Sequence, residues 1–158
     1  MTRDEVKKVF SHLEAPWKLI AQLLYGSGLR LSEGMKLRVK DLDFGQGTIT
    51  IHDAKGGTHR IVPLPRALEV KLKSHLEGAR ERHLKDLAAG LGNTHIPQSL
   101  QKKYPNAPRE WAWQFVFPAA KLCQHPRTQV IARYHLHEGS MQRQFKRAVN
   151  KTGIAKRI

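Results

Sequence analysis

The sequence has 158 residues, enough for one domain or part of one, and 40% of them are hydrophobic, which argues against a disordered basic tail. Its 28 Lys and Arg residues against 13 Asp and Glu residues give a net charge of +15, which indicates a nucleic-acid partner. The sequence has no apolar run long enough to span a membrane, and its start lacks a signal-peptide core, so we do not expect a secreted protein. The single cysteine, Cys123, excludes a multi-cysteine zinc site.

Two helices are expected at the start of the chain. Thr2 and Glu5 have the spacing of a capping box and predict a helix to about residue 13. Pro16 suits the first turn of a second helix, which carries one apolar stripe and which Gly26 and Gly28 are expected to end. Both helices are predicted to pack one face against a core.

A short helix and a β-hairpin follow. Ser32 is expected to cap a helix that runs toward Leu37. Residues 48–52 and 59–63 alternate with period two around glycine-rich turn residues, which predicts an antiparallel hairpin with Lys55 at its tip.

The second half reads less regularly. A helix is predicted from just after Pro65 to about Gly90, and residues 90–109 show little periodicity. Residues 111–118 are aromatic and apolar, which predicts a short strand, and a last helix is expected to end at Gly153. The predicted fold class is mainly α with a small antiparallel β-sheet, in one unit over residues 1–158.

Arg30 and Lys55 have the chemistry to act on a phosphodiester without a metal. Guanidinium groups hold the non-bridging oxygens, and an acid protonates the leaving 5′-oxygen while a nucleophile attacks. Arg30 lies at a helix junction, and Lys55 lies on the predicted hairpin. We therefore expect the two side chains to converge on one backbone phosphate, with no cofactor.

These residues carry a resemblance to a known family. Residues 23–33, Leu-Leu-Tyr-Gly-Ser-Gly-Leu-Arg-Leu-Ser-Glu, resemble the first arginine box of the tyrosine recombinases, and the match continues into the hairpin residues 55–64. The resemblance implies that Arg30 clamps the scissile phosphate, that Glu33 supports it, and that Lys55 is the general acid. It also implies a bacterial, nucleoid-associated, cytoplasmic protein.

The second half is similar to the integron integrase subgroup. Residues 110–119, 126–127 and 133–138 carry this similarity, which implies an inserted region over about residues 90–137. In the subgroup the insertion grips unpaired bases of folded single-stranded recombination sites, and the enzyme integrates gene cassettes. The residues that the resemblance assigns to DNA binding are Trp113, Pro126, Tyr134 and His135.

The family pattern stops before it is complete. None of the nine histidines is followed three residues later by arginine, and the three tyrosines, Tyr25, Tyr104 and Tyr134, precede the place of the nucleophile. We expect a partial catalytic domain, truncated at the C-terminus and without the core-binding domain, that is inactive alone. Its uncovered apolar surface favours a homo-oligomer. A stand-alone nucleic-acid-binding module on the same scaffold remains the alternative.

Several roles stay open on the sequence alone. Trp113 is equally compatible with base stacking and with a core position. The basic run Lys36, Arg38 and Lys40 fits a solvated face or a phosphate track equally well. His135 and His137 could suggest a metal pair, but no third ligand is evident, so no metal is expected.

Overall fold

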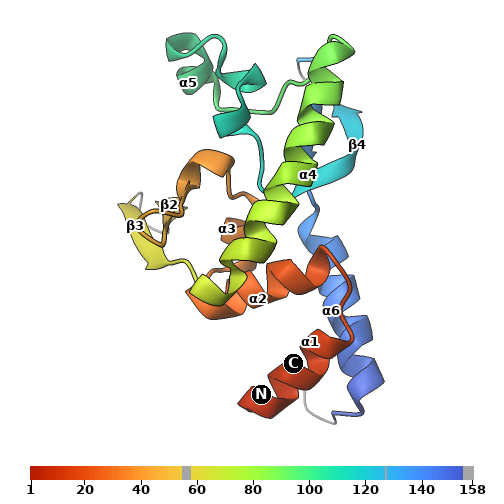
Figure 1. Cartoon of the computed structure of the whole chain (residues 1–158). Helices are drawn as coiled ribbons and strands as arrows, with labels where there is room; N and C mark the ends of the chain where they lie inside the picture. The colour runs from red at the N-terminus through yellow and green to blue at the C-terminus, as the bar shows by residue number, and fades with distance from the viewer. Residues whose placement is uncertain (55–57, 127, 155–158) are drawn as a thin grey trace.

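A computed structural model shows how the chain is arranged and describes residues 1–54, 58–126 and 128–154 (Figure 1). The fold is mainly helical with small antiparallel sheets, as predicted. The α-helices are α1 (Arg3–Ser11), α2 (Trp17–Ser27), α3 (Leu31–Met35), α4 (Glu69–Ala88), α5 (Gln98–Lys103) and α6 (Glu138–Thr152). The strands are β1 (Leu42–Asp43), β2 (Thr48–Ala54), β3 (Thr58–Pro63), β4 (Pro118–Gln124) and β5 (Ile131–His135). Short 3-10 turns are η1 (Val39–Asp41), η2 (Arg66–Leu68), η3 (Ala107–Arg109) and η4 (Trp111–Trp113).

The helix ends follow local side-chain chemistry. Thr2 and Glu5 form the predicted capping box at the start of α1. Gly28 ends α2 with φ of 63°, a left-handed conformation that glycine adopts without strain. The prediction that Ser32 caps the next helix is wrong: α3 begins at Leu31, and the backbone N–H of Arg30 donates to Glu33 Oε2 at 2.7 Å.

The predicted hairpin is confirmed. Strand β2 pairs antiparallel with β3, and β1 adds to the other edge of β2. Ile49 and Ile51 of β2 face the core, with 0% and 2% of their surface exposed. Because side chains alternate along a strand, the neighbouring residues of the hairpin face outward. Lys55 lies outside the described residues.

The strand predicted over residues 111–118 is wrong for most of its length. Trp111–Trp113 form the turn η4, in which Trp113 N donates to Glu110 O. The buried Gln114 side chain donates to two carbonyl oxygens of this turn region. The chain then runs beside residues 37–39, and strand β4 begins at Pro118 and pairs with β5. Local hydrogen bonds therefore override the strand propensity of the tryptophans.

Residues 90–109, which show little periodicity in the sequence, are anchored to the rest of the molecule. They contain α5 and η3, and Thr94 N donates to Pro108 O at 2.8 Å. Arg38 donates to His95 O at 2.7 Å and also to Trp113 O. Its guanidinium lies 4.4 Å from the Phe115 ring centroid. Arg38 therefore joins this region to the chain after α3.

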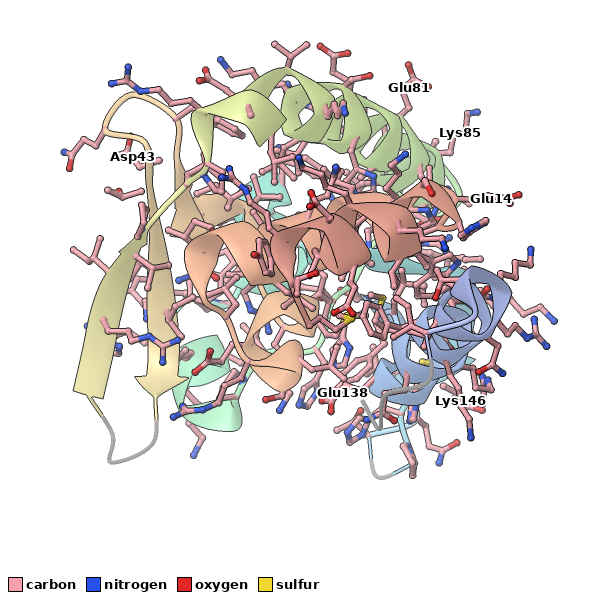
Figure 2. The ribbon with its side chains drawn as sticks, turned by 90° about the horizontal axis from the view of Figure 1, so that it is seen from below. Glu14, Asp43, Glu81, Lys85, Glu138 and Lys146 are labelled. Carbon is pink, nitrogen blue, oxygen red and sulfur yellow. The ribbon has the colours of Figure 1, made fainter. Side chains whose placement is uncertain are left out.

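The main core lies where α2, α4, the hairpin and residues 115–117 meet. Its largest fully buried side chains are Phe117, Ile20, Leu23, Met35, Ile49, Leu72, Val9 and Val116. The hairpin and α6 lie on opposite sides of this core, in both Figure 1 and Figure 2. Within the described residues, no helix is both long and apolar enough to cross a membrane.

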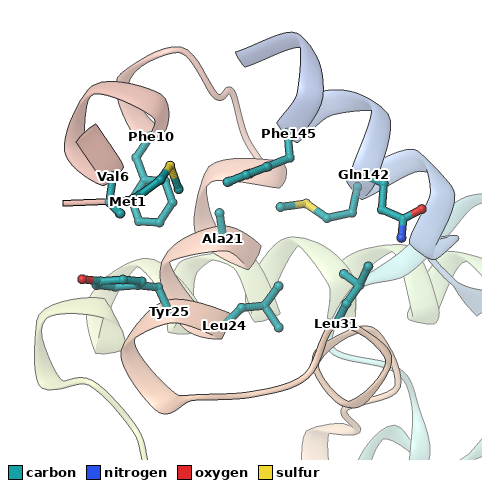
Figure 3. A pocket seen from close by; sticks show the side chains of 10 residues that line it. Met1, Val6, Phe10, Ala21, Leu24, Tyr25, Leu31, Gln142 and Phe145 are labelled. Carbon is teal, nitrogen blue, oxygen red and sulfur yellow. The ribbon is translucent and has the colours of Figure 1, made fainter. Parts of the chain in front are cut away.

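An open apolar pocket of about 370 Å³ lies between α1, α2 and α6 (Figure 3). The rings of Phe10, Tyr25 and Phe145 face it, and all its lining residues except Gln142 are apolar or aromatic. Tyr25 is 61% exposed although it lies beside this pocket. Part of the chain's uncovered apolar surface therefore lies in this pocket.

Candidate functional site

Arg30 lies at the junction of α2 and α3, where its side chain is partly exposed to solvent. Its side chain is 58% exposed, while that of Glu33 is 9% exposed. Arg30 Nη1 donates to Glu33 Oε1 at 3.1 Å, and the Arg30 backbone N–H donates to Oε2 of the same carboxylate. Among the described residues, Arg30 Nη2 and Nε have no hydrogen-bond partner. Arg30 is thus held by Glu33 through its backbone N–H and Nη1, and its other two guanidinium nitrogens remain unpaired, in the part of the chain that the structure describes, on a largely exposed side chain, which suits a phosphate ligand.

A second arginine, which the sequence analysis did not single out, completes this arrangement. Arg60 of β3 donates from Nη1 to Glu33 Oε1 and from Nη2 to Oε2, both at 2.8 Å. Arg60 lies in the hairpin motif that resembles the family, but nothing in the local pattern indicated a contact with a residue 27 positions earlier. The pair joins the hairpin directly to α3.

The pKa of Glu33 is lowered. Burial raises the pKa of this carboxyl, but the hydrogen bonds from Arg60 and from the Arg30 backbone, together with both guanidinium charges, lower it by more. Glu33 is therefore a carboxylate across the physiological range. Two guanidinium groups around one carboxylate leave an excess positive charge at this site.

Polar side chains also gather where β2 and β3 face η1. Lys40 Nζ lies 3.3 Å and His52 Nε2 lies 3.0 Å from Asp41 Oδ1. Across the hairpin, the Nδ1 atoms of His52 and His59 lie 3.2 Å apart. Within the described part of the chain, no group of three His, Cys, Asp or Glu side chains could hold a metal ion.

Trp113 is connected to this polar group through Lys40. The Lys40 ammonium lies 4.6 Å from a Trp113 ring centroid, which is within cation–π range. The Tyr104 ring lies 6.3 Å from the Trp113 ring on another side. Trp113 is half-buried. A stacking role for Trp113 stays a prediction.

The other residues assigned to DNA binding lie on or beside the β4–β5 hairpin. Pro126 is exposed next to its turn, and Tyr134 is 38% exposed and contacts the Phe115 ring edge-to-face at 5.5 Å. His135 is only 8% exposed; its Nδ1 lies 2.7 Å from Leu136 O, and burial lowers its pKa. Tyr134 and Pro126 are thus open to a ligand, while the His135 ring is covered by its own chain.

An aromatic cluster that the sequence did not reveal extends from Tyr134. The His95 ring lies 6.2 Å from Tyr134 and stacks on His125 at 4.9 Å, with the two planes 6° apart. Because His95 belongs to the 90–109 region and His125 to the β4–β5 hairpin, this contact joins the two parts of the expected insertion. Stacked rings at a basic surface are a platform on which nucleic-acid bases pack.

The chain is similar to known proteins over nearly its whole length. The phage integrase family matches the chain over residues 1–158. An integrase/recombinase of Escherichia coli is 44% identical over 156 residues, which is 99% of this chain and 46% of the relative. The tyrosine recombinase XerA of Pyrococcus furiosus is 38% identical over 79 residues, covering 48% of this chain and 28% of the relative. The chain thus spans less than half the length of these relatives.

Solved structures share the fold. The crystal structure of the XerA recombinase aligns with a TM-score of 0.62 at 18% identity, covering 100% of this chain and 44% of that one. The XerH site-specific recombinase bound to its difH substrate, in a pre-cleavage complex, aligns with a TM-score of 0.56 at 17% identity, covering 100% of this chain and 38% of that one. With the match over the whole sequence and the arginine site described above, the chain belongs to the phage integrase family, that of the tyrosine recombinases.

Proposed function

We propose that this chain is the DNA-binding part of the catalytic domain of a site-specific recombinase of the integron integrase subgroup. The whole protein would cut and rejoin DNA strands to integrate gene cassettes. The observation that carries the proposal is Arg30, which is held by Glu33 and directs its remaining donors outward on a chain with a net charge of +15. Such a guanidinium suits a scissile phosphate.

In this proposal each residue has its own role in the cutting of one DNA strand. Arg30 holds the non-bridging oxygens, and Glu33 keeps it in position. Lys55, which lies outside the described residues, gives a proton to the 5′-oxygen when the P–O5′ bond breaks and a tyrosine oxygen bonds to phosphorus. The sequence contains no His-x-x-Arg box, and none of its three tyrosines lies where the family has its nucleophile. The chain alone is therefore expected not to cut DNA.

The subgroup is proposed from the insertion over about residues 90–137. Trp113, Pro126 and Tyr134 have accessible surface there, beside the His95–His125 stack. Aromatic rings recognise unpaired bases by stacking, whereas a perfect duplex keeps its bases covered. The proposed substrate is therefore a folded single strand with extrahelical bases. The proposed role of His135 requires its ring to become uncovered.

A gel-shift comparison tests this function. We expect the chain to bind a hairpin with bulged bases more tightly than the fully paired hairpin of the same sequence. Equal affinity for the two would contradict the integron assignment, and no binding to either would contradict the DNA-binding proposal. A nicked substrate that traps a covalent protein–DNA product tests cutting separately, and we expect no such product.

The alternative function, a stand-alone nucleic-acid-binding module, rests on the missing His-x-x-Arg box. Adding separately produced C-terminal residues of the Escherichia coli relative to this chain distinguishes the two. Restored strand cutting supports the recombinase, and unchanged binding without cutting supports the module. Self-association of the chain stays a prediction, which sedimentation analysis tests.

A further inference from the structure

Arg60 holds the Glu33 carboxylate in a planar fork. Both Arg60 Nη atoms donate to Glu33, one to each oxygen, at 2.8 Å. The Arg60 side chain is 32% exposed and that of Glu33 is 9% exposed, so water competes weakly for these bonds. Arginine forms such two-bond pairs because its donors are fixed in one plane, and lysine cannot reproduce them.

The backbone of Arg60 is itself well anchored. Arg60 pairs across the hairpin with Ile51, which is 2% exposed and belongs to the main core. The fork therefore begins at a point of β3 that cannot move freely. It reaches Glu33 in α3, three residues after Arg30.

Glu33 is saturated with donors. Within the described residues it accepts four hydrogen bonds: two from Arg60, one from the Arg30 backbone and one from Arg30 Nη1. A carboxylate has roughly four lone-pair sites, so no acceptor capacity remains. Arg30 therefore donates only one side-chain hydrogen bond to a carboxylate that would otherwise accept bonds from two of its nitrogens.

Charge leads to the same conclusion. With Arg60 present, two guanidinium groups face one carboxylate, and one positive charge is left over. Without Arg60, Arg30 and Glu33 would neutralise each other, and the carboxylate would be free to turn and bind Arg30 through two nitrogens. The donors that Arg30 now directs outward would then be occupied.

We propose that Arg60 is a positioning residue that occupies Glu33 so that Arg30 keeps its charge and its outward N–H groups for a DNA phosphate. The inference rests on the proposed function, because it assumes that Arg30 contacts phosphate. Arg60 acts through Glu33, without touching the phosphate itself. It also ties the hairpin to the Arg30 helix junction.

The contact is tested without DNA by the pKa of the Glu33 carboxyl, followed by carbon-13 NMR. The hydrogen bonds and charge of Arg60 lower this pKa, so Arg60→Gln is expected to raise it. Arg60→Lys, which keeps the charge and loses the fork, is expected to fall between wild type and Arg60→Gln. Arg80→Gln on the exposed face of α4 removes the same charge elsewhere and is the matched control.

The functional part is tested by affinity for a short labelled DNA duplex at fixed salt. We expect Arg60→Gln to weaken binding about tenfold, the effect of losing one charge-assisted phosphate contact. Arg80→Gln is expected to weaken it far less. The double variant Arg30→Gln with Arg60→Gln should bind no more weakly than Arg30→Gln alone, because Arg60 acts only through Arg30.

Each result bears on a different part of the inference. A Glu33 pKa that responds equally to Arg60→Gln and Arg80→Gln would overturn it, and so would additive losses in the double variant. Thermal unfolding of each variant separates a loss of fold from a loss of phosphate binding, and Arg60→Lys provides the better folded comparison. A wild-type chain that binds no DNA would overturn the proposed function, while the NMR result would still report on the Arg60–Glu33 contact.

Discussion

Asp86 of α4 and Arg133 of β5 form a buried two-bond ion pair. Arg133 Nε donates to Asp86 Oδ2 at 2.7 Å and Nη2 donates to Oδ1 at 2.8 Å, and each side chain is 11% exposed. Arg133 Nη1 also donates to the carbonyl oxygens of Ala119 and Ala120. One guanidinium thus fixes both strands of the β4–β5 hairpin, which carries Pro126 and Tyr134, to the longest helix.

Removing the carboxylate should destabilise the chain strongly. Asp86→Ala leaves the Arg133 charge buried without its partner, a change that costs about 3 kcal/mol or more in comparable buried pairs. Urea unfolding followed by circular dichroism measures this loss. Glu81→Ala, at an exposed position of the same helix, is the control and should change stability by less than about 0.5 kcal/mol. Equal effects of the two changes would show that the ion pair adds nothing.

Stability should fall as the solution becomes mildly acidic. Burial lowers the pKa of His75 below its ordinary value of 6.5, although the bond to Val116 O opposes this, and burial lowers the pKa of His83 too. A histidine with a lowered pKa binds protons more readily in the unfolded state, so stability is full above pH 6.5 and declines as the pH falls below it. Urea midpoints between pH 8 and pH 5 measure the decline.

His75→Gln provides the comparison for this pH dependence. His75 is the histidine whose Nε2 lies 2.8 Å from Val116 O and whose ring packs 5.0 Å from that of Phe117. The variant should be less stable at pH 8 and should show a shallower decline toward pH 5. His83, His95 and His135, whose pKa values burial also lowers, account for the remaining slope. A slope identical to that of wild type would contradict the role of His75.

Selectivity for unpaired bases should depend on Trp113. Trp113→Ala is expected to remove the preference for bulged hairpins over paired ones, because it deletes the ring that Lys40 and Tyr104 border, and a stacked base contributes about 1–3 kcal/mol. Trp111→Ala is the matched control, because the Trp111 ring packs against the His83 ring of α4, with the two ring centroids 5.9 Å apart. Gel shifts on the two hairpins measure both variants. An unchanged preference in Trp113→Ala would assign Trp113 to packing alone.

The sequence predicts the local parts of the site better than the contacts between them. The Arg30 junction and the hairpin follow from glycines and period-two alternation, which act within a few residues. The Glu33–Arg60 fork joins residues far apart in sequence, so no local pattern contains it. His135 was expected to face a base, yet Phe115 covers it at 5.1 Å, a contact set by how residues 114–117 run beside residues 37–39.

The β4–β5 sheet was not predicted for a related reason. Polar residues are spread along both strands, and most positions of β4 are exposed, so alternation is weak. Arg133 of β5 instead donates to Asp86, which lies outside the sheet on α4, and to the β4 backbone. Only the three-dimensional arrangement brings these groups together.

Two residues of the basic run after α3, Arg38 and Lys36, differ in their contacts. Arg38 donates to His95 O and Trp113 O and lies over Phe115, whereas Lys36 is exposed. Arg38→Gln should therefore lower stability by about 2 kcal/mol, because two carbonyl groups lose their charged donor. Thermal unfolding measures this loss.

Lys36→Gln should behave in the opposite way. Stability is expected to stay within about 0.5 kcal/mol of wild type, while the slope of log affinity for duplex DNA against log salt becomes shallower by about 0.9, the value for one lost phosphate contact. Fluorescence anisotropy over a salt series measures the slope for both variants. Since Arg38 already spends its donors on the protein, Arg38→Gln should leave the slope unchanged wherever the variant remains folded. A shallower salt slope in Arg38→Gln, together with an unchanged slope in Lys36→Gln, would reverse this assignment and make Arg38 the phosphate contact.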